Sequence, residues 1–237
     1  MSNMFDQTMT ASSLSFSVPT LANSVQYAAS NPDASQPGTP SDIGRIETDP
    51  AGPEVAARRN GETTPGQLYL KEARSRFRYY QYLTVQAIQQ VDDEGFFYAR
   101  GKDSNSIAII VKHLIGNMRS RFTDFLTSDG EKPDRNRDDE FERFVRDTRE
   151  RLEIALEHAW ELVIDTVDEI TEEMLTETVY IRSQPLSVLE AINRQLTHYS
   201  YHVGQIVYLA KQACGDDWKS LSIPKGRSDE FNREMMR

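Results

Sequence analysis

The stretch PLSVLEAINRQLTHYSYHVGQIVYLAK at residues 185–211 decides the fold, because it is the longest strongly periodic segment of the chain. Apolar side chains recur along it at helical spacing, at Leu189, Ile192, Leu196, Tyr199, Val203, Ile206 and Ala210. Pro185 suits the first turn of a helix, and Ser183 just before it suits an N-cap. The stretch therefore predicts one long amphipathic helix with its apolar face in a core.

Two histidines in this helix, His198 and His202, stand four residues apart against the apolar face. Residues at this spacing lie one turn above the other, so both imidazoles can hold one metal ion from the same side. Gln205 continues the polar stripe three residues later. The spacing alone also fits a buried, hydrogen-bonded histidine, which is the commoner explanation. Burying two imidazoles without strong partners is costly, however, and a metal ion would satisfy both.

Composition sets limits on the class of protein. A chain of 237 residues allows one good-sized domain or two small ones. A net charge of −10 disfavours nucleic acid and anionic membranes as partners, because phosphate binding depends on clustered Lys and Arg. No apolar run reaches the roughly 18 residues of a membrane span, and the N-terminus lacks the pattern of a signal peptide. We therefore expect a soluble cytoplasmic protein that acts on a small molecule.

The chain has a single cysteine, Cys214, so no disulfide can form within it. This fits a reducing compartment. Cys214 follows the long helix in the sequence Ala-Cys-Gly, where a small residue at a helix end is the simplest explanation. No neighbouring signature of an activated thiolate favours a nucleophilic role.

Residues 1–64 are rich in Ser, Thr, Pro, Ala, Asn and Gly. The prolines remove backbone hydrogen bonds from helices and sheets, and the apolar residues are too sparse to form a core. We interpret this segment as a disordered leader, or as an upstream extension from a misplaced start codon. The hydrophobic share of 38% for the whole chain agrees with an unstructured part.

Three further amphipathic helices are predicted. One covers residues 67–91, one runs from a cap at Ser104 or Asn105 to about residue 127, and one covers 141–167, where Phe144 and Val145 are expected to face inward. Residues 96–104 and 128–139 are predicted loops, residues 171–175 a short helical piece, and 178–182 an extended segment. The tail at 215–237 is expected to pack through Trp218, Leu221 and Ile223 before a frayed end. Residues 65–237 therefore predict an all-α fold, an antiparallel-type four-helix bundle.

Such a bundle would form a site from side chains on facing helices. If the second and fourth helices are neighbours, His113 can meet His198 and His202. Three neutral imidazoles with an open position make a catalytic-type site for Zn²⁺ or Ni²⁺. The remaining histidine, His158, lies among acidic residues and is interpreted as solvated.

Polar residues around this triad are candidates for supporting or substrate contacts. Asn117 and Gln205 each lie one turn from a predicted ligand. Arg135 and Arg137, in the loop at 128–139, could bind an anionic group or simply pair with the surrounding acids, which is the commoner outcome. No Asp or Glu falls on the predicted inner faces, so a carboxylate general base is not evident.

Four segments together carry a resemblance to a known family. They are NSIAIIVKHLIGN at 105–117, DGEKPDRNRD at 129–138, HYSYHVGQIVYLAK at 198–211 and DWKSLSIPKG at 217–226. The combination resembles the DUF1572 family, part of the DinB-like (YfiT-like) superfamily of four-helix metalloproteins, which is distinct from the DNA polymerase that shares the DinB name. The resemblance covers the chain from about residue 67 onward and leaves the leader unmatched.

The resemblance implies a metal-binding triad with one histidine on the second helix and two on the fourth, at positions that match His113, His198 and His202. It also implies thiol-dependent S-transfer or isomerisation, with bacillithiol, mycothiol or glutathione as the thiol, and often a homodimer. We therefore expect a divalent-metal-dependent transferase that activates a low-molecular-weight thiol. A metal hydrolase that uses bound hydroxide and a non-enzymatic, stress-associated metal-binding bundle are the alternatives.

Overall fold

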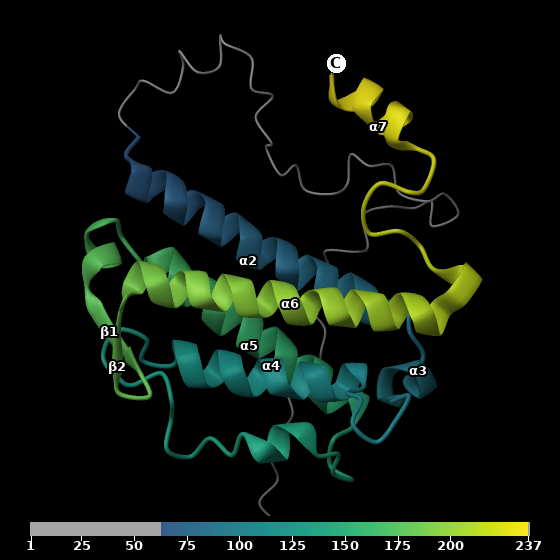
Figure 1. Ribbon diagram of the computed structural model, residues 1–237, viewed down its shortest axis with the longest axis horizontal. Helices are drawn as coiled ribbons and strands as arrows, with labels where there is room; N and C mark the ends of the chain where they lie inside the picture. The colour runs from purple at the N-terminus through teal and green to yellow at the C-terminus, as the bar shows by residue number, and fades with distance from the viewer. Residues whose placement is uncertain (1–62, 237) are drawn as a thin grey trace, which may run out of the picture. The chain divides into compact units, whose positions relative to one another are not determined.

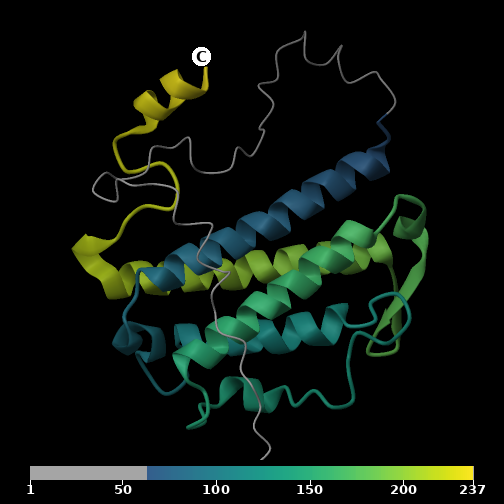
Figure 2. The same ribbon diagram turned by 180° about the vertical axis from the view of Figure 1, so that it is seen from behind.

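The computed structural model describes residues 63–236, and its core is a bundle of four helices. These are α2 (Pro65–Gln89), α4 (Ile107–Phe122), α5 (Arg149–Glu169) and α6 (Val188–Cys214). Helix α2 packs on α5 and α6, and α4 packs on the same two helices (Figures 1 and 2). The all-α four-helix prediction is confirmed. The predicted leader at 1–64 lies outside the described residues except for its last two, so the domain boundary stays a prediction.

The helix that carries two of the histidines begins later than predicted. Its N-cap is Ser187, whose hydroxyl accepts a hydrogen bond from the Glu190 amide while the Glu190 carboxylate accepts one from the Ser187 amide. This capping box satisfies amide groups that the first turn leaves unpaired. Pro185 and Ser183, predicted to start the helix, instead lie in a strand and its turn.

The third long helix also begins later, at Arg149 after the N-cap Thr148. Residues 141–148, predicted to be helical, belong to the loop that joins α4 and α5 (residues 123–148, the α4–α5 loop). Phe144 and Val145 do not face a core, and Val145 is fully exposed. The Asp147 carboxylate accepts hydrogen bonds from the Phe144 amide and from Lys112, which holds this segment as a turn.

The bounds of two further segments also differ from the prediction. Helix α4 is capped by Ser106 and ends at Phe122, because Thr123 is extended, with ψ of 125°, and Asp124 after it has a left-handed backbone with φ of 49°. The first two residues of the predicted loop at 96–104 are the end of a short helix, α3 (Asp93–Phe97), whose cap Asp92 accepts a hydrogen bond from the Gly95 amide at 2.8 Å.

A small antiparallel hairpin leads into α6. It pairs β1 (Thr178–Ile181), part of the extended segment predicted at 178–182, with β2 (Gln184–Ser187), after a 3-10 turn at Glu173–Thr176 where a helical piece was predicted. The hairpin turn at Arg182 and Ser183 has positive φ at both residues. Asp129, in the α4–α5 loop, accepts hydrogen bonds from both of these backbone amides, so the loop is tied to the hairpin.

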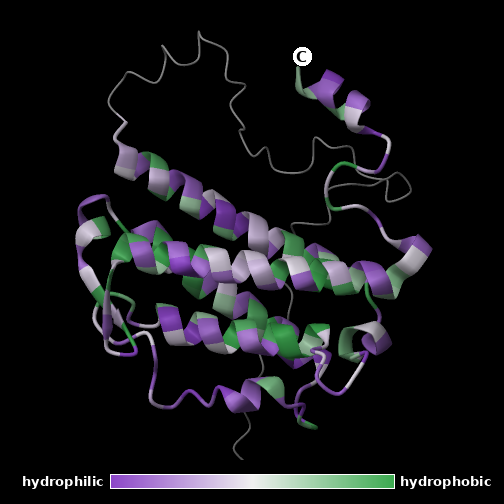
Figure 3. Cartoon of the chain, viewed as in Figure 1, coloured by the Kyte–Doolittle hydropathy of each residue, from purple (hydrophilic) through white to green (hydrophobic). Residues whose placement is uncertain are grey.

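The core between the helices is apolar and rich in aromatic rings. Tyr199 of α6 makes edge contacts with Phe77 of α2 and Trp160 of α5, at centroid distances of 5.9 and 5.6 Å. Each long helix carries hydrophobic and hydrophilic residues on different faces (Figure 3). Among the described helices none has an apolar stretch of the length and composition of a membrane span.

The C-terminal tail partly follows the prediction. Trp218 and Leu221 pack against the core, as expected, whereas Ile223 is 39% exposed. The end of the chain, predicted to fray, forms a helix, α7 (Ser228–Met235), with no buried residue.

Candidate metal centre

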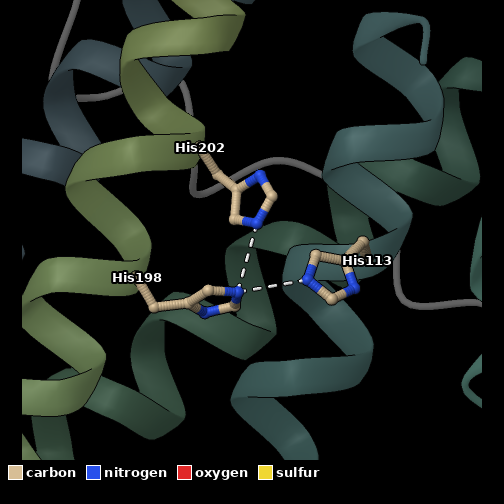
Figure 4. A group of neighbouring side chains, drawn as sticks. All are labelled: His113, His198 and His202. Carbon is tan, nitrogen blue, oxygen red and sulfur yellow. Dashed lines mark hydrogen bonds between the residues drawn. The ribbon is translucent and has the colours of Figure 1, made fainter. Parts of the chain in front are cut away.

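Three histidines meet between α4 and α6. His113 extends from α4, and His198 and His202 extend from consecutive turns of α6 (Figure 4). The Nε2 atom of His198 lies 3.2 Å from Nε2 of His113 and 3.1 Å from Nε2 of His202. One ring nitrogen from each residue lies within 4.8 Å of the others. The predicted convergence of these three imidazoles is confirmed.

Two of the three nitrogen separations, those from His198, suit a shared cation. A tetrahedral zinc ion with bonds of about 2.05 Å to nitrogen places two ligand nitrogens about 3.3 Å apart. The two Nε2 separations of 3.2 and 3.1 Å come close to that value. Three histidine nitrogens leave at least one coordination position for another ligand, as catalytic rather than structural sites do.

Two hydrogen bonds determine which ring nitrogen of His113 and of His202 faces the centre of the triad. Nδ1 of His113 lies 2.8 Å from Oε2 of Glu140, and Nδ1 of His202 lies 2.9 Å from Oε1 of Gln205. Both oxygens accept, so both Nδ1 atoms donate, and both Nε2 atoms keep a lone pair. His198 can donate from Nε2 to only one of them. A cation between the rings would bind a lone pair from the Nε2 atom of each histidine. Hydrogen bonds among the three rings cannot satisfy all three Nε2 atoms in this way, whichever nitrogens carry the protons.

The environment keeps the α6 imidazoles neutral. Burial, reinforced by the nearby His202 and His113, lowers the pKa of His198 to about 3. Burial also lowers the pKa of His202, against the opposing effect of its hydrogen bond to Gln205. Nδ1 of His198 is buried and has no hydrogen-bond partner among the described residues. Neutral imidazole is the form that binds a metal ion, so these rings are ready ligands at pH 7.

A carboxylate that the sequence did not predict, that of Glu140, reaches the triad from a loop rather than from an inner helix face. Glu140 comes from a 3-10 turn (Asp138–Phe141) in the α4–α5 loop, and it is 6% exposed. Burial raises the pKa of Glu140, but the hydrogen bonds from His113 and Arg135 outweigh this effect and leave the pKa below its usual value. The residue has no helical periodicity, so the sequence offers no pattern that places it inside.

The two predicted loop arginines have different surroundings. Arg135 binds both oxygens of Glu140, at 2.7 and 2.9 Å, and lies 3.7 Å from Glu131. It therefore pairs with acids, the commoner of the two outcomes expected from the sequence. Arg137 is exposed and lies over the ring of Phe141, 5.3 Å from its centroid. Arg137 does not reach the triad directly, although Phe141 contacts the His113 ring.

The other predicted residues divide between the site and the surface. Gln205 contacts His202, as described above. Asn117 is buried one turn beyond His113, and its side-chain oxygen accepts a hydrogen bond of 3.2 Å from the Tyr199 hydroxyl. Burial raises the pKa of Tyr199, so this hydroxyl stays protonated and remains a donor. His158 is exposed on α5, as predicted.

The family described as "Protein of unknown function (DUF1572)" matches residues 64–227. The chain belongs to the DUF1572 family. The match includes all four bundle helices, the α4–α5 loop and the three histidines. No curated protein and no solved structure matches this DUF1572 chain. Its chemistry must therefore be argued from the site itself.

Proposed function

We propose that this DUF1572 protein binds a divalent metal ion, Zn²⁺ or Ni²⁺, through His113, His198 and His202. We further propose that it uses the ion to transfer a low-molecular-weight thiol to a small electrophilic substrate. The observation that carries the proposal is the convergence of three imidazole nitrogens, two of which have lone pairs directed by Glu140 and Gln205. Imidazole ligands with an open position suit either ion.

The residues around the triad favour thiol transfer over hydrolysis. A divalent cation bound there would lower the pKa of a neighbouring thiol, so the thiolate forms at neutral pH without a separate base. Hydrolysis profits from a free carboxylate that can take a proton from water. Glu140 is the carboxylate at the triad, and both of its oxygens are already engaged by His113 and Arg135.

Three further parts of the proposal come from the family resemblance. We place the protein in the DinB-like superfamily, where thiol-dependent transferases are found, and we expect it to act in the cytoplasm as a homodimer. Support for the superfamily is the four-helix bundle with one histidine on α4 and two on α6. The net charge of −10 agrees with a small-molecule substrate rather than nucleic acid.

Metal content tests the first part of the proposal. The wild-type protein, produced in medium that contains zinc and nickel, is expected to retain metal after gel filtration, and His202→Ala is expected to lose it. His158→Ala is the matched control, because His158 is exposed on a different helix and should leave the metal content unchanged. Equal metal in wild type and His202→Ala would contradict metal binding at the triad.

A panel of thiols and electrophiles tests the second part. We expect consumption of an electrophile that depends on both metal and added thiol and disappears in His202→Ala. Turnover of activated esters without a thiol would instead establish a hydrolase. Retained metal with no turnover across the panel would leave a metal-binding protein that is not an enzyme.

A further inference from the structure

The support of His113 comes from a remote part of the chain. Glu140 stands 27 residues after His113 in sequence, yet its carboxylate accepts the Nδ1 proton at 2.8 Å, and both side chains are buried. The corresponding partner of His202 is Gln205, on the same helix, only three residues away. One ligand is therefore oriented by its own helix, and the other depends on where the α4–α5 loop places a charged group.

Arg135 fixes the position of that carboxylate. Its Nε and Nη2 atoms donate to the two oxygens of Glu140 in a bidentate pair, and its side chain is 5% exposed. Such a pair is stronger and more directional than a single hydrogen bond. Glu131 extends the network, because it contacts Arg135 at 3.7 Å and Arg121 of α4 at 3.0 Å. Arg135 therefore holds both oxygens of the carboxylate, including the Oε2 atom that accepts from His113.

Helix α4 leaves room for the carboxylate at one residue, Gly116. A Cβ atom built at Gly116 would lie 2.6 Å from the Glu140 carboxyl carbon and closer still to its Oε1 atom. Real Cβ atoms do not approach other atoms that closely, so any larger residue would displace Glu140. Gly116 lies three residues after His113, on the same side of α4. A glycine weakens a helix interior, and here its missing side chain admits the acceptor.

We propose that Glu140, held by Arg135 and admitted by Gly116, is a positioning residue that keeps His113 in the Nδ1-protonated tautomer with Nε2 facing α6. The α4–α5 loop thereby sets the affinity of the centre for its ion. This second statement rests on the proposed metal binding, whereas the first concerns the metal-free protein as well. Partners of this kind fix the ring orientation of a ligand, and their loss typically weakens metal binding about 10- to 100-fold.

The first test reads the tautomer of His113 without any metal. In ¹⁵N-labelled, chelator-treated protein, the ring nitrogen shifts of His113 are expected to report a proton on Nδ1. Gly116→Ala should move His113 toward the Nε2-protonated form, because it displaces the carboxylate without removing a charge. Gly204→Ala is the control, since a Cβ there meets nothing within 4 Å although Gly204 is only two residues after His202. An unchanged His113 tautomer in Gly116→Ala would overturn the positioning role.

The second test measures Zn²⁺ affinity by competition with a chromophoric chelator. Gly116→Ala is expected to bind Zn²⁺ about 10- to 100-fold more weakly than wild type, and Gly204→Ala equally well. Glu140→Gln keeps an acceptor oxygen but loses the charge, so its affinity should fall between the two. Equal affinity of Gly116→Ala and wild type would overturn the link between the loop and the ion. Should Gly116→Ala fail to fold, unchanged affinity in Glu140→Gln would do the same.

The two tests separate this inference from the proposed function. A wild-type protein that binds no Zn²⁺ or Ni²⁺, with the tautomer change still present in Gly116→Ala, would reject the metal centre and retain the positioning of His113. Metal binding lost in His202→Ala and unaffected in Gly116→Ala would retain the centre and reject the link between Glu140 and the affinity for the ion. The rise in Tm on adding Zn²⁺ provides a further check. A merely structural role would lower the Tm of the metal-free protein and leave this rise unchanged.

Discussion

The two helices that supply the triad support their histidines in different ways. On α6, His198 and His202 are related by the repeat of the helix, and Gln205 on the next turn holds His202. On α4, His113 has a charged partner from a loop, and that partner is held by Arg135. One half of the centre forms whenever α6 folds, whereas the other half needs the tertiary placement of Glu140. Changes near α4 are therefore expected to matter more.

The largest effect should follow from Glu140→Ala in the metal-free protein. The substitution leaves Arg135 buried with Glu131, at 3.7 Å, as its one remaining ion-pair partner within residues 63–236. Breaking a buried pair by removing one partner costs about 3 to 5 kcal/mol, and the remaining acid favours the lower end. Gln205→Ala, on the more exposed α6 side, should cost less than about 1 kcal/mol. Urea unfolding measures both, and similar losses would contradict the asymmetry between the helices.

The next effect concerns a buried hydrogen bond that connects α4 and α6. The Tyr199 hydroxyl donates to the side-chain oxygen of Asn117 in the buried core. Tyr199→Phe removes the donor and leaves the Asn117 oxygen unsatisfied, which should cost about 1 to 2 kcal/mol. Because the ring contacts remain, Zn²⁺ affinity should change less than twofold. A large loss of affinity in Tyr199→Phe would contradict the separation of this hydrogen bond from the centre and show that it, too, sets the affinity for the ion.

A smaller effect is expected from acid. The unfolded chain protonates His198 near pH 6.5, whereas the folded protein does so only near pH 3. The unfolded state therefore binds more protons between these values, and the stability of the metal-free protein falls as the pH drops below about 6.5. From pH 7 to pH 5 the loss should be on the order of 1 kcal/mol, allowing for solvent screening of the half-buried ring. Urea titrations of wild type and His198→Ala should show a weaker pH dependence in the variant.

The smallest effect is expected at the far end of α6. The Cys214 thiol donates to the Gln90 carbonyl at 3.1 Å, and burial together with Asp217 and Asp92 raises its pKa. A thiol of raised pKa is a poor nucleophile and a poor ligand at pH 7. Cys214→Ala should therefore leave metal content and turnover unchanged and cost less than about 1 kcal/mol. Loss of turnover in Cys214→Ala would indicate that the reaction depends on Cys214 rather than on the triad alone.

The difference between the α6 and α4 sides of the triad also explains which of its residues the sequence could predict. The pair on α6 follows from helical spacing, and His113 follows once α4 and α6 are taken as neighbours. Glu140 has no such pattern, because its place depends on the path of a long loop. Phe144 and Val145 show the opposite error, because the sequence pattern predicts that they face the core and in the structure they do not. They extend the apolar period of α5 backward by coincidence, but the turn held by Asp147 keeps them out of the helix.

The start of α6 was also predicted wrongly, because one residue there suits two kinds of local structure. Pro185 fits a first helical turn and also an edge strand, where its missing N–H costs nothing. Pairing with Tyr180 in the hairpin selects the strand, and the Ser187–Glu190 capping box begins the helix afterwards. A signature of Ser followed three residues later by Glu was present in the sequence and was the better guide.

The attachment of the α4–α5 loop at two points, Asp129 and Glu140, has a consequence for a protein divided in two. Asp129 binds the hairpin before α6, and Glu140 binds His113, while Pro133 and Asp134 between them are exposed. A chain cut at this exposed point would give one fragment with His113 and another with His198 and His202. If the triad binds a metal ion as proposed, adding that ion should strengthen reassembly of the fragments beyond what the shared apolar core provides, so complementation between them would assay the centre.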